Sequence, residues 1–219
     1  MRKNSKTNSK KIIMFKKSLI ITTTLFGVLI TNAQDNGDFE FGVNAGLNLA
    51  NVSTIDGQNS ASTRISFNAG VIGEYFFSDR WGIKAKLTYD SKGWSDGFIE
   101  GEDFDAITTN FKLDYLTIPI TANWHFGSNR NWYLHFGPYI GVLISAKDSE
   151  LGLDLKDGFK SSDLGLALGI GHKFEINDNT KLFIELDGQS GLTDIFEINP
   201  VDPIRNTRSS LNFGLLFNL

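Results

Sequence analysis

The sequence contains no cysteine and little proline. Its 219 residues include 4 Pro, 2 Met and 22 Gly, and 41% are hydrophobic. The lack of cysteine excludes disulfides, cysteine-based zinc sites, a thiol nucleophile and lipid attachment to a cysteine. The hydrophobic content is too high for a disordered chain. We therefore expect one folded domain, of a length that also suits a single all-β barrel.

Acidic residues are missing from the first 33 positions, which contain seven of the 21 Lys and Arg residues. The remaining chain has 21 − 7 = 14 basic residues against 25 acidic ones, a net charge of −11. Because a polyanion repels such a surface, nucleic acid is disfavoured as a partner.

The N-terminal segment has the three parts of a secretory signal peptide. Lysines and one arginine precede the apolar run Leu19–Ile30, and small residues end the segment at Ala33. This run is well short of the roughly 20 residues that a spanning helix needs. We predict a signal peptide at 1–33, cleaved before Gln34, and one domain at 34–219. Translation from Met14 would also leave a complete signal.

No later stretch is long and apolar enough for a transmembrane helix, and residues instead alternate in character. From Phe39 the odd positions are apolar and the even ones are polar or small. Successive side chains of a strand point to opposite faces, so this period of two predicts strands. In the fourth segment the pattern predicts a change of phase near Tyr115. The eight predicted strands are Phe39–Ala50, Ile65–Phe77, Trp81–Asp90, Phe111–Phe126, Trp132–Ile144, Asp163–Phe174, Lys181–Ser190 and Thr207–Leu219.

Long and short connections alternate along the chain. The long ones are Asn51–Arg64, Ser91–Asn110, Ser145–Ser162 and Gly191–Asn206. Outer-membrane barrels have long loops at one end and tight turns at the other. The pattern predicts an eight-stranded antiparallel up-and-down transmembrane β-barrel with both termini on the periplasmic side.

A soluble barrel of the lipocalin kind would have the same period but an apolar interior. Three features favour the membrane barrel. Glycines recur on the polar face, as the narrow interior of eight strands requires. The strands match the 9–11 residues that cross a bilayer. Finally, aromatic residues gather beside the short turns as an interfacial girdle would. They are Tyr75, Phe77, Trp81, Trp124, Phe126, Trp132, Phe174 and Phe217.

The polar face also contains charges of both signs, as a buried network needs if each charge is to find a partner. Two interpretations are open: a plugged, ion-paired lumen, or a gated path for ions or small solutes. We favour the plug because eight strands leave room for little besides side chains. The predicted network is Glu40, Glu74, Lys84, Lys86, Asp90, Lys173, Glu185, Asp187 and Arg208.

Pro119 and Pro138 fall inside strand patterns, although proline cannot donate to a strand ladder. If Gly127–Asn131 sets the register, the two are near neighbours on adjacent strands. We therefore predict a shared bulge or ladder gap, visible as interrupted pairing around both residues.

Four motifs, in the same order along the chain, resemble the PorT-type outer-membrane β-barrel family over nearly the whole mature chain. They are the run 115–120 (Tyr-Leu-Thr-Ile-Pro-Ile), Gly137–Gly141, the Gly-rich run Asp163–Gly171, and Gly191–Ile195. The resemblance implies an outer-membrane barrel. The founding member is linked to protein secretion through that membrane, but such a role does not transfer across a broad family.

The last strand resembles the C-terminal signal that the barrel-assembly machinery binds. Asn212, Gly214 and Phe217 have the expected spacing, whereas Leu219 stands where an aromatic residue is usual. A plain amphipathic last strand is the alternative.

No catalytic or cofactor motif emerges. His125 and His135 could lie close together in the lumen near the periplasmic end, but a metal site needs more ligands. The long connection Ser91–Asn110 contains the acidic residues Asp96, Glu100, Glu102, Asp103 and Asp105. Such oxygen-rich clusters can hold Ca²⁺ or Mg²⁺ and bridge to lipopolysaccharide, although acidic loops are commonly just solvated.

We predict a barrel without catalysis or cofactors, whose four surface loops have structural, adhesive or interaction duties. Its expected partners are outer-membrane lipid, lipopolysaccharide, the assembly machinery and other envelope proteins. Three alternatives stay open: an accessory barrel of a secretion system, a narrow channel, and a soluble ligand-binding barrel.

Overall fold

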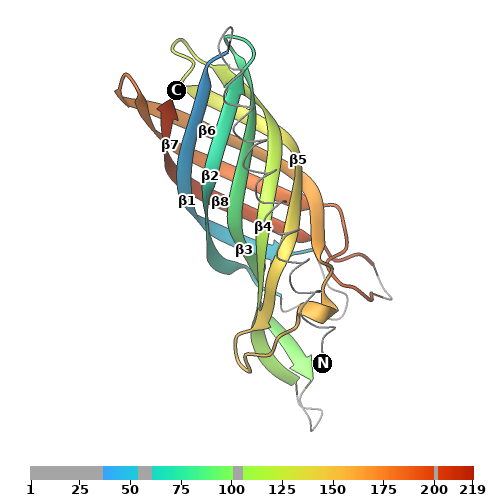
Figure 1. Cartoon of the computed structure of the whole chain (residues 1–219). Coiled ribbons are helices and arrows are strands. Elements are labelled where there is room, and N and C mark those ends of the chain that lie inside the picture. Colours follow the sequence, from blue (N-terminus) through green and yellow to red (C-terminus); the bar gives the residue numbers. More distant parts are fainter. Residues whose placement is uncertain (1–36, 54–60, 101–105, 200–201) are drawn as a thin grey trace, which may run out of the picture. The chain divides into compact units, whose positions relative to one another are not determined.

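The computed structural model describes residues 37–53, 61–100, 106–199 and 202–219. Residues 38–219 form one compact unit, in which eight antiparallel strands close into a barrel (Figure 1). The predicted fold class is confirmed. The signal-peptide prediction falls outside the described residues. The strands are β1 (Phe39–Val52), β2 (Arg64–Phe76), β3 (Trp81–Glu100), β4 (Ala106–Phe126), β5 (Trp132–Asp148), β6 (Ser162–Asn177), β7 (Thr180–Gly191) and β8 (Asn206–Asn218), with a 3-10 turn η1 (Lys156–Gly158) before β6.

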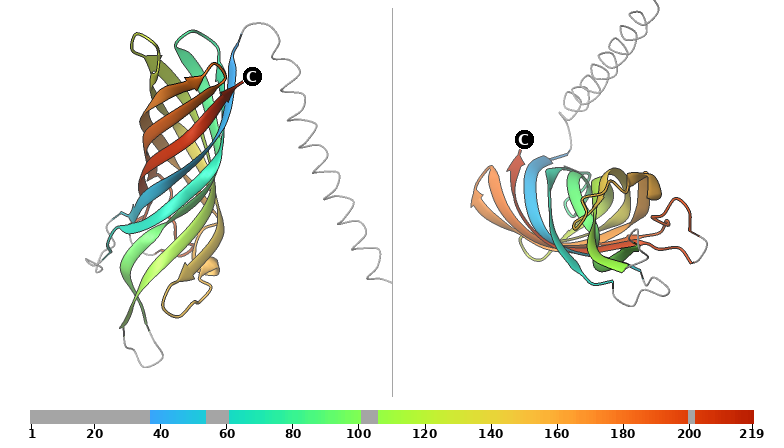
Figure 2. Two further views of the ribbon diagram at one scale, coloured as in Figure 1. Left: turned by 90° about the vertical axis from the view of Figure 1, so that its left-hand side faces the viewer. Right: turned by 90° about the horizontal axis from the view of Figure 1, so that it is seen from below.

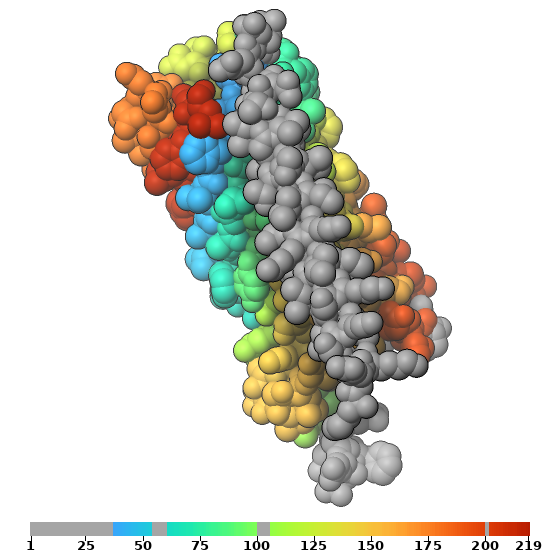
Figure 3. All heavy atoms as spheres, in the orientation of Figure 1, coloured from blue at the N-terminus to red at the C-terminus, as the bar shows by residue number. Residues whose placement is uncertain are grey.

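The barrel closes between its first and last strands. β1 and β8 are paired from Glu40 opposite Asn218 to Val52 opposite Asn206, and their atoms lie side by side in Figure 3. Closure leaves no strand edge in the hydrocarbon, where an unpaired backbone group would be costly. Among the described residues no helix is long and apolar enough to cross a bilayer, an observation that concerns helices alone.

Side chains alternate between the two faces of the wall. The apolar set points outward: Phe41 is 41% exposed, Val71 52% and Leu168 58%. The polar residues between them are buried inside. This is the arrangement of a membrane barrel, and it is the reverse of the soluble alternative.

β3, β4 and β5 extend beyond the other strands at the long-loop end (Figure 2). β3 continues to Glu100 and β4 begins at Ala106, with Trp94 opposite Phe111 in their shared ladder. The expectation of a loop over Ser91–Asn110 is therefore wrong for its described part. Aromatic and β-branched residues such as Trp94, Phe111 and Ile107 favour strand in this segment.

The predicted phase change near Tyr115 is also wrong. In β4 the odd positions point inward without a break from Thr109 to His125. What changes is their chemistry, since Phe111, Leu113 and Tyr115 are apolar or aromatic and Thr117 onward is mostly polar. The irregularity lies in β5, where Ile144 is an extra residue between the pairs Asp114–Ser145 and Tyr115–Leu143.

The proline prediction is confirmed as a pair of ladder gaps. The β3–β4 pairing is interrupted between Ala85–Ile120 and Thr88–Thr117, beside Pro119. The β4–β5 pairing is interrupted between Pro119–Tyr139 and Ala122–Phe136, opposite Pro138. Each ladder resumes in the same register, so the gaps come from the missing N–H groups and not from bulges.

The long-loop end of the barrel is closed by an apolar core, which we call the apolar cap. Trp94 stacks on Phe111 with ring centroids 4.4 Å apart, and Phe159 and Phe196 approach Trp94 edge-on at 6.2 and 6.3 Å. Strand extensions and two loops thus share one core. The apolar cap comprises Val52, Trp94, Phe111, Leu113, Tyr115, Leu143, Ala146, Phe159, Ile195 and Ile204, with Phe196 packed against it.

Candidate functional site: a charged lumen beneath an apolar cap

Buried ion pairs run through the barrel interior from one end to the other. We call this set the charged lumen. Six carboxylates and six cations belong to it, and each forms an ion pair inside the barrel. The members are Glu40, Glu74, Asp90, Asp163, Glu185 and Asp187, with Lys84, Lys86, Lys92, Lys173, Lys181 and Arg208.

The first layer lies at the short-turn end. The Lys173 ammonium lies 2.5 Å from Glu40 and 3.3 Å from Glu74. Glu74 also accepts hydrogen bonds from the Asn123 amide at 2.6 Å and the His125 ring at 2.7 Å. Lys181 reaches Glu40 from the mouth of the barrel at the short-turn end, at 2.5 Å. Each carboxylate therefore has several donors, which offset the cost of its burial.

Glu185 is the centre of the second layer. It is fully buried and accepts hydrogen bonds from Lys84, Lys86 and the Tyr133 hydroxyl, the last at 2.9 Å. Asp187, two residues along the same face of β7, lies 2.7 Å from Arg208 and 3.5 Å from Lys86. Alternation along β7 places both carboxylates inside the barrel.

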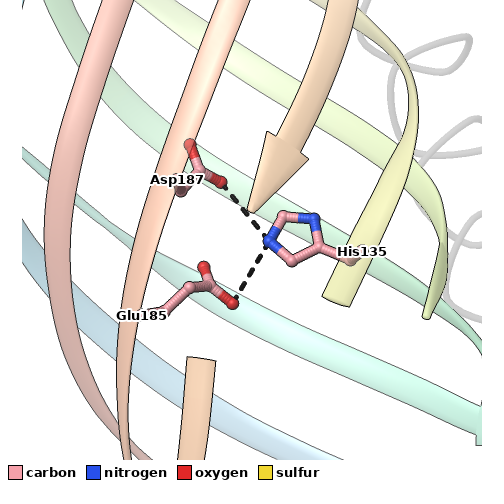
Figure 4. A group of neighbouring side chains, drawn as sticks. All are labelled: His135, Glu185 and Asp187. Atoms are coloured by element: carbon pink, nitrogen blue, oxygen red, sulfur yellow. Dashed lines mark ion pairs between the residues drawn. The ribbon is translucent and has the colours of Figure 1, made fainter. Parts of the chain in front are cut away.

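His135 enters this layer from β5 (Figure 4). Its Nε2 lies 3.4 Å from Glu185 and 3.9 Å from Asp187. The three side chains could supply a set of metal ligands, since their ligand atoms lie within 4.8 Å of one another. However, Lys86 contacts both carboxylates and Arg208 pairs with Asp187. The carboxylate charges are thus already balanced by ammonium and guanidinium groups, and this arrangement suits an ion-pair network better than a cation site.

Amide side chains link the second layer to the third. Arg208 Nε lies 3.2 Å from Asp90, whose other oxygen accepts a hydrogen bond from Asn48 at 2.9 Å. Asn68 donates to both Asn48 and Asn212. These bonds connect β1, β2, β3 and β8 across the lumen. The strands are therefore joined by side chains in the interior in addition to the backbone hydrogen bonds of the wall.

The third layer, which is the one nearest the apolar cap, is the ion pair of Lys92 and Asp163, which are both fully buried and 3.0 Å apart. Asp163 also accepts hydrogen bonds from Tyr139 and Asn206, and Lys92 lies over the Tyr139 ring at 4.4 Å. Sequence reasoning missed both residues. Lys92 falls in the predicted loop Ser91–Asn110, and Asp163 is left out of the predicted network although its odd position puts it on the polar face with Gly165.

Glycines make room for the large inward side chains. A Cβ atom added at Gly169 would lie 2.3 Å from His135 Nε2, and one at Gly171 would lie 2.3 Å from the Tyr133 ring. Each glycine is paired directly with the residue it accommodates, Gly169 with His135 and Gly171 with Tyr133. The glycines of the polar face are therefore the counterpart of bulky groups on the neighbouring strand.

The structure places all the predicted lumen charges inside the barrel and brings them into this network. His125 and His135 are both inside, but they contact different carboxylates, with Tyr133 between their rings. His172 lies on the outer wall between Trp132 and Phe174.

The predicted girdle residues all lie on the outer face near the short turns. Trp81 and Trp124 are cross-strand partners with ring centroids 6.4 Å apart, and Phe41 packs against Phe217 at 5.2 Å. Of the predicted cation-binding residues, Asp96 is exposed on β3 with a positive φ of 56°. Residues 101–105 and the Glu100 side chain lie outside the described part of the chain.

At the long-loop end, Asp194 holds the β7–β8 loop in place. It accepts hydrogen bonds from the Phe196 and Ile204 N–H groups at 3.1 and 3.3 Å and from Asn199 at 2.8 Å. Partial burial opposes ionisation of Asp194, but these donors outweigh it and lower the pKa of the carboxyl. These hydrogen bonds to Asp194, which we call the Asp194 clasp, position Ile195 and Ile204 in the apolar cap.

The sequence matches the family model of the outer membrane protein beta-barrel domain over residues 32–197. The chain belongs to this family. Among curated proteins, no relative matches. This β-barrel family member is located in the outer membrane. In bacterial barrels of this kind the long loops are extracellular and the short turns periplasmic.

Solved structures of outer-membrane barrels resemble this family member in fold. Neisserial surface protein A is 17% identical, with a TM-score of 0.51 over 84% of this chain and 99% of that chain. OprG from Pseudomonas aeruginosa is 15% identical (TM-score 0.49; 84% and 96% covered), and outer membrane protein W from E. coli is 14% identical (0.43; 85% and 100%). At these identities the likeness to neisserial surface protein A concerns the fold alone.

Proposed function

We propose that this barrel is a PorT-type outer-membrane protein with structural and interaction duties at its extracellular end, without catalysis and without conduction through its lumen. One observation carries the proposal: the interior is filled by mutually paired charges, and the apolar cap lies over them. A path for solutes would require breaking several buried ion pairs at once. The extended β3–β4–β5 sheet and its loops remain as the surface available to partners.

Conductance tests this proposal. The protein, purified from outer membranes and inserted in a planar bilayer, should give no discrete current steps, while an open porin inserted under the same conditions should. Steps from this protein that are altered by Lys92→Met, which removes the charge facing Asp163 beneath the cap, would contradict a plugged lumen.

The partners follow from the same proposal. The segment 1–33 directs export and is removed before Gln34, and β8 presents the C-terminal signal to the assembly machinery. Lipid and lipopolysaccharide surround the wall, and envelope proteins, including those of a secretion system, contact the loops. Cross-linking on intact cells through cysteines placed at exposed Leu153 or Ile198 should capture envelope proteins, whereas a cysteine at Arg80 in a periplasmic turn should not capture the same ones.

A further inference from the structure

Two lysines face each other on the outer wall above the lipid-facing belt. Lys112 of β4 and Lys147 of β5 are directly paired, and both side chains are exposed. Like charges directly opposite each other destabilise a strand pair. Within the described chain neither ammonium group has a hydrogen bond or ion pair. The pair therefore places two positive charges side by side, and neither has an ion-pair partner in the described protein.

Two carboxylates close to the pair along the strands accept hydrogen bonds from other groups and form no ion pair with either lysine. Asp114, on the same face as Lys112, accepts a hydrogen bond from the Ser91 hydroxyl at 2.7 Å. Asp154, which is bridged to Lys147 through the backbone, accepts the Lys156 N–H at 3.0 Å. The Lys156 ammonium in turn donates to the Ile144 carbonyl at 3.1 Å. That bond holds the Lys156 ammonium, a third cation, beside β5 at Ile144.

These lysines stand a short distance above the apolar belt of the outer wall. The exposed apolar face ends at Leu116 on β4 and at Ile144 on β5. Lys112 lies four residues beyond Leu116, about 13 Å along the strand at roughly 3.3 Å per residue. A strand tilt of roughly 40° makes this about 10 Å of height above the apolar belt. The head-group layer adds roughly 5–7 Å to each side of the hydrocarbon, so a lysine side chain at that height is long enough to reach it.

We propose that Lys112 and Lys147, assisted by Lys156, bind phosphate groups of lipopolysaccharide in the outer leaflet. A phosphate between the two ammonium groups would replace their repulsion with two charge-assisted hydrogen bonds. This inference deepens the proposed interaction role, and it rests on the orientation that places the long loops outside the cell.

The test measures lipid retained by the protein purified from outer membranes. In mixed detergent micelles, native mass spectrometry counts diphosphorylated lipid A per barrel, in competition with lipid A stripped of its phosphates or with phosphatidylglycerol. The wild type should prefer the diphosphorylated form. Removing each lysine should weaken this preference about fivefold, so that Lys112→Gln with Lys147→Gln loses about 25-fold.

The matched control removes two charges at the other end of the barrel, Arg80→Gln with Arg130→Gln in the short turns, and should retain the preference. Without lipid A, the lysine variant should unfold in urea no earlier than wild type, because the repulsion between Lys112 and Lys147 is gone. The inference fails if the lysine variant retains lipid A like the wild type, or if phosphatidylglycerol or stripped lipid A competes equally. A barrel that conducts but keeps the lysine-dependent preference would overturn the proposed plug and leave the lipid site standing.

Discussion

The charged lumen and the apolar cap are built by the same strands, yet their interiors have opposite chemistry. On β4 the inward residues Asn123, Thr121 and Thr117 are polar, whereas Tyr115, Leu113 and Phe111 farther along the same face are not. The change falls where the outer face stops being apolar, after Leu116. In a bilayer the apolar side chains face lipid and the interior takes the polar groups. Above the bilayer the surroundings are water, and the hydrophobic effect again favours an apolar interior.

The largest effect should follow from breaking the lumen network at its centre. Glu185→Ala leaves Lys84 and Lys86 buried and without their main partner, and an unpaired buried charge costs about 3–5 kcal/mol. We expect the free energy of unfolding in urea to fall by that amount. Asp79→Asn, which removes an exposed ion pair with Arg130, should change it little. Equal effects of the two substitutions would contradict an energetic role for the charged lumen.

A cavity in the apolar cap should cost less and act locally. Ile195→Ala removes buried methyl groups between strand extension and loop, which we expect to cost about 2 kcal/mol, the low end for such truncations because the loop can relax. Hydrogen exchange should quicken in residues 149–161 and 192–205 and stay unchanged in β7. Faster exchange throughout the barrel would show that the apolar cap and the charged lumen unfold as one unit.

Filling the space beside His135 tests the packing of the lumen. Gly169→Ala places a methyl group against His135 and the Leu186 carbonyl, and overpacking of this kind costs about 1–3 kcal/mol. Gly158→Ala is the matched control, because nothing lies within 4 Å of a Cβ there. The two unfolding midpoints in urea should separate clearly, and coincident midpoints would argue against a tightly filled lumen.

The smallest effect should come from acid acting on the β7–β8 loop. The lowered pKa of Asp194 means that its stabilisation is present above the ordinary carboxyl pKa of about 4 and is lost as pH falls through the lower folded value. Asp194→Asn should therefore loosen the loop at neutral pH by less than about 1 kcal/mol. In the wild type, acid should speed protease cleavage between residues 192 and 205. In Asp194→Asn this acid-induced increase should be smaller, because the carboxyl that titrates is gone. An unaltered pH profile in this variant would contradict the clasp.

Much of the wall could be predicted from the sequence because lipid imposes a simple rule on it. The apolar set around Phe41, Val71 and Leu168 repeats every second residue, so the strands and their outer face follow directly. The ladder gaps could also be predicted from the two prolines, because the missing N–H group is a property of the residue itself.

The strand extensions could not be predicted in this way. Beyond the bilayer the outer face meets water, so the apolar residues lie on the inner face of the strand instead. In the sequence pattern, Trp94 then falls in a predicted loop and Phe111 in a predicted change of phase. Only pairing with the neighbouring strand reveals that β3 and β4 continue.

By itself the sequence determined that the chain forms eight strands with an apolar outside and a polar inside, because alternation is a property of each strand alone. The tertiary structure decided which charges meet, such as Lys92 with Asp163 and Lys84 with Glu185. It also decided that Lys112 stands opposite Lys147. These pairings depend on strand register and on distances across the closed barrel, which join residues far apart in the chain.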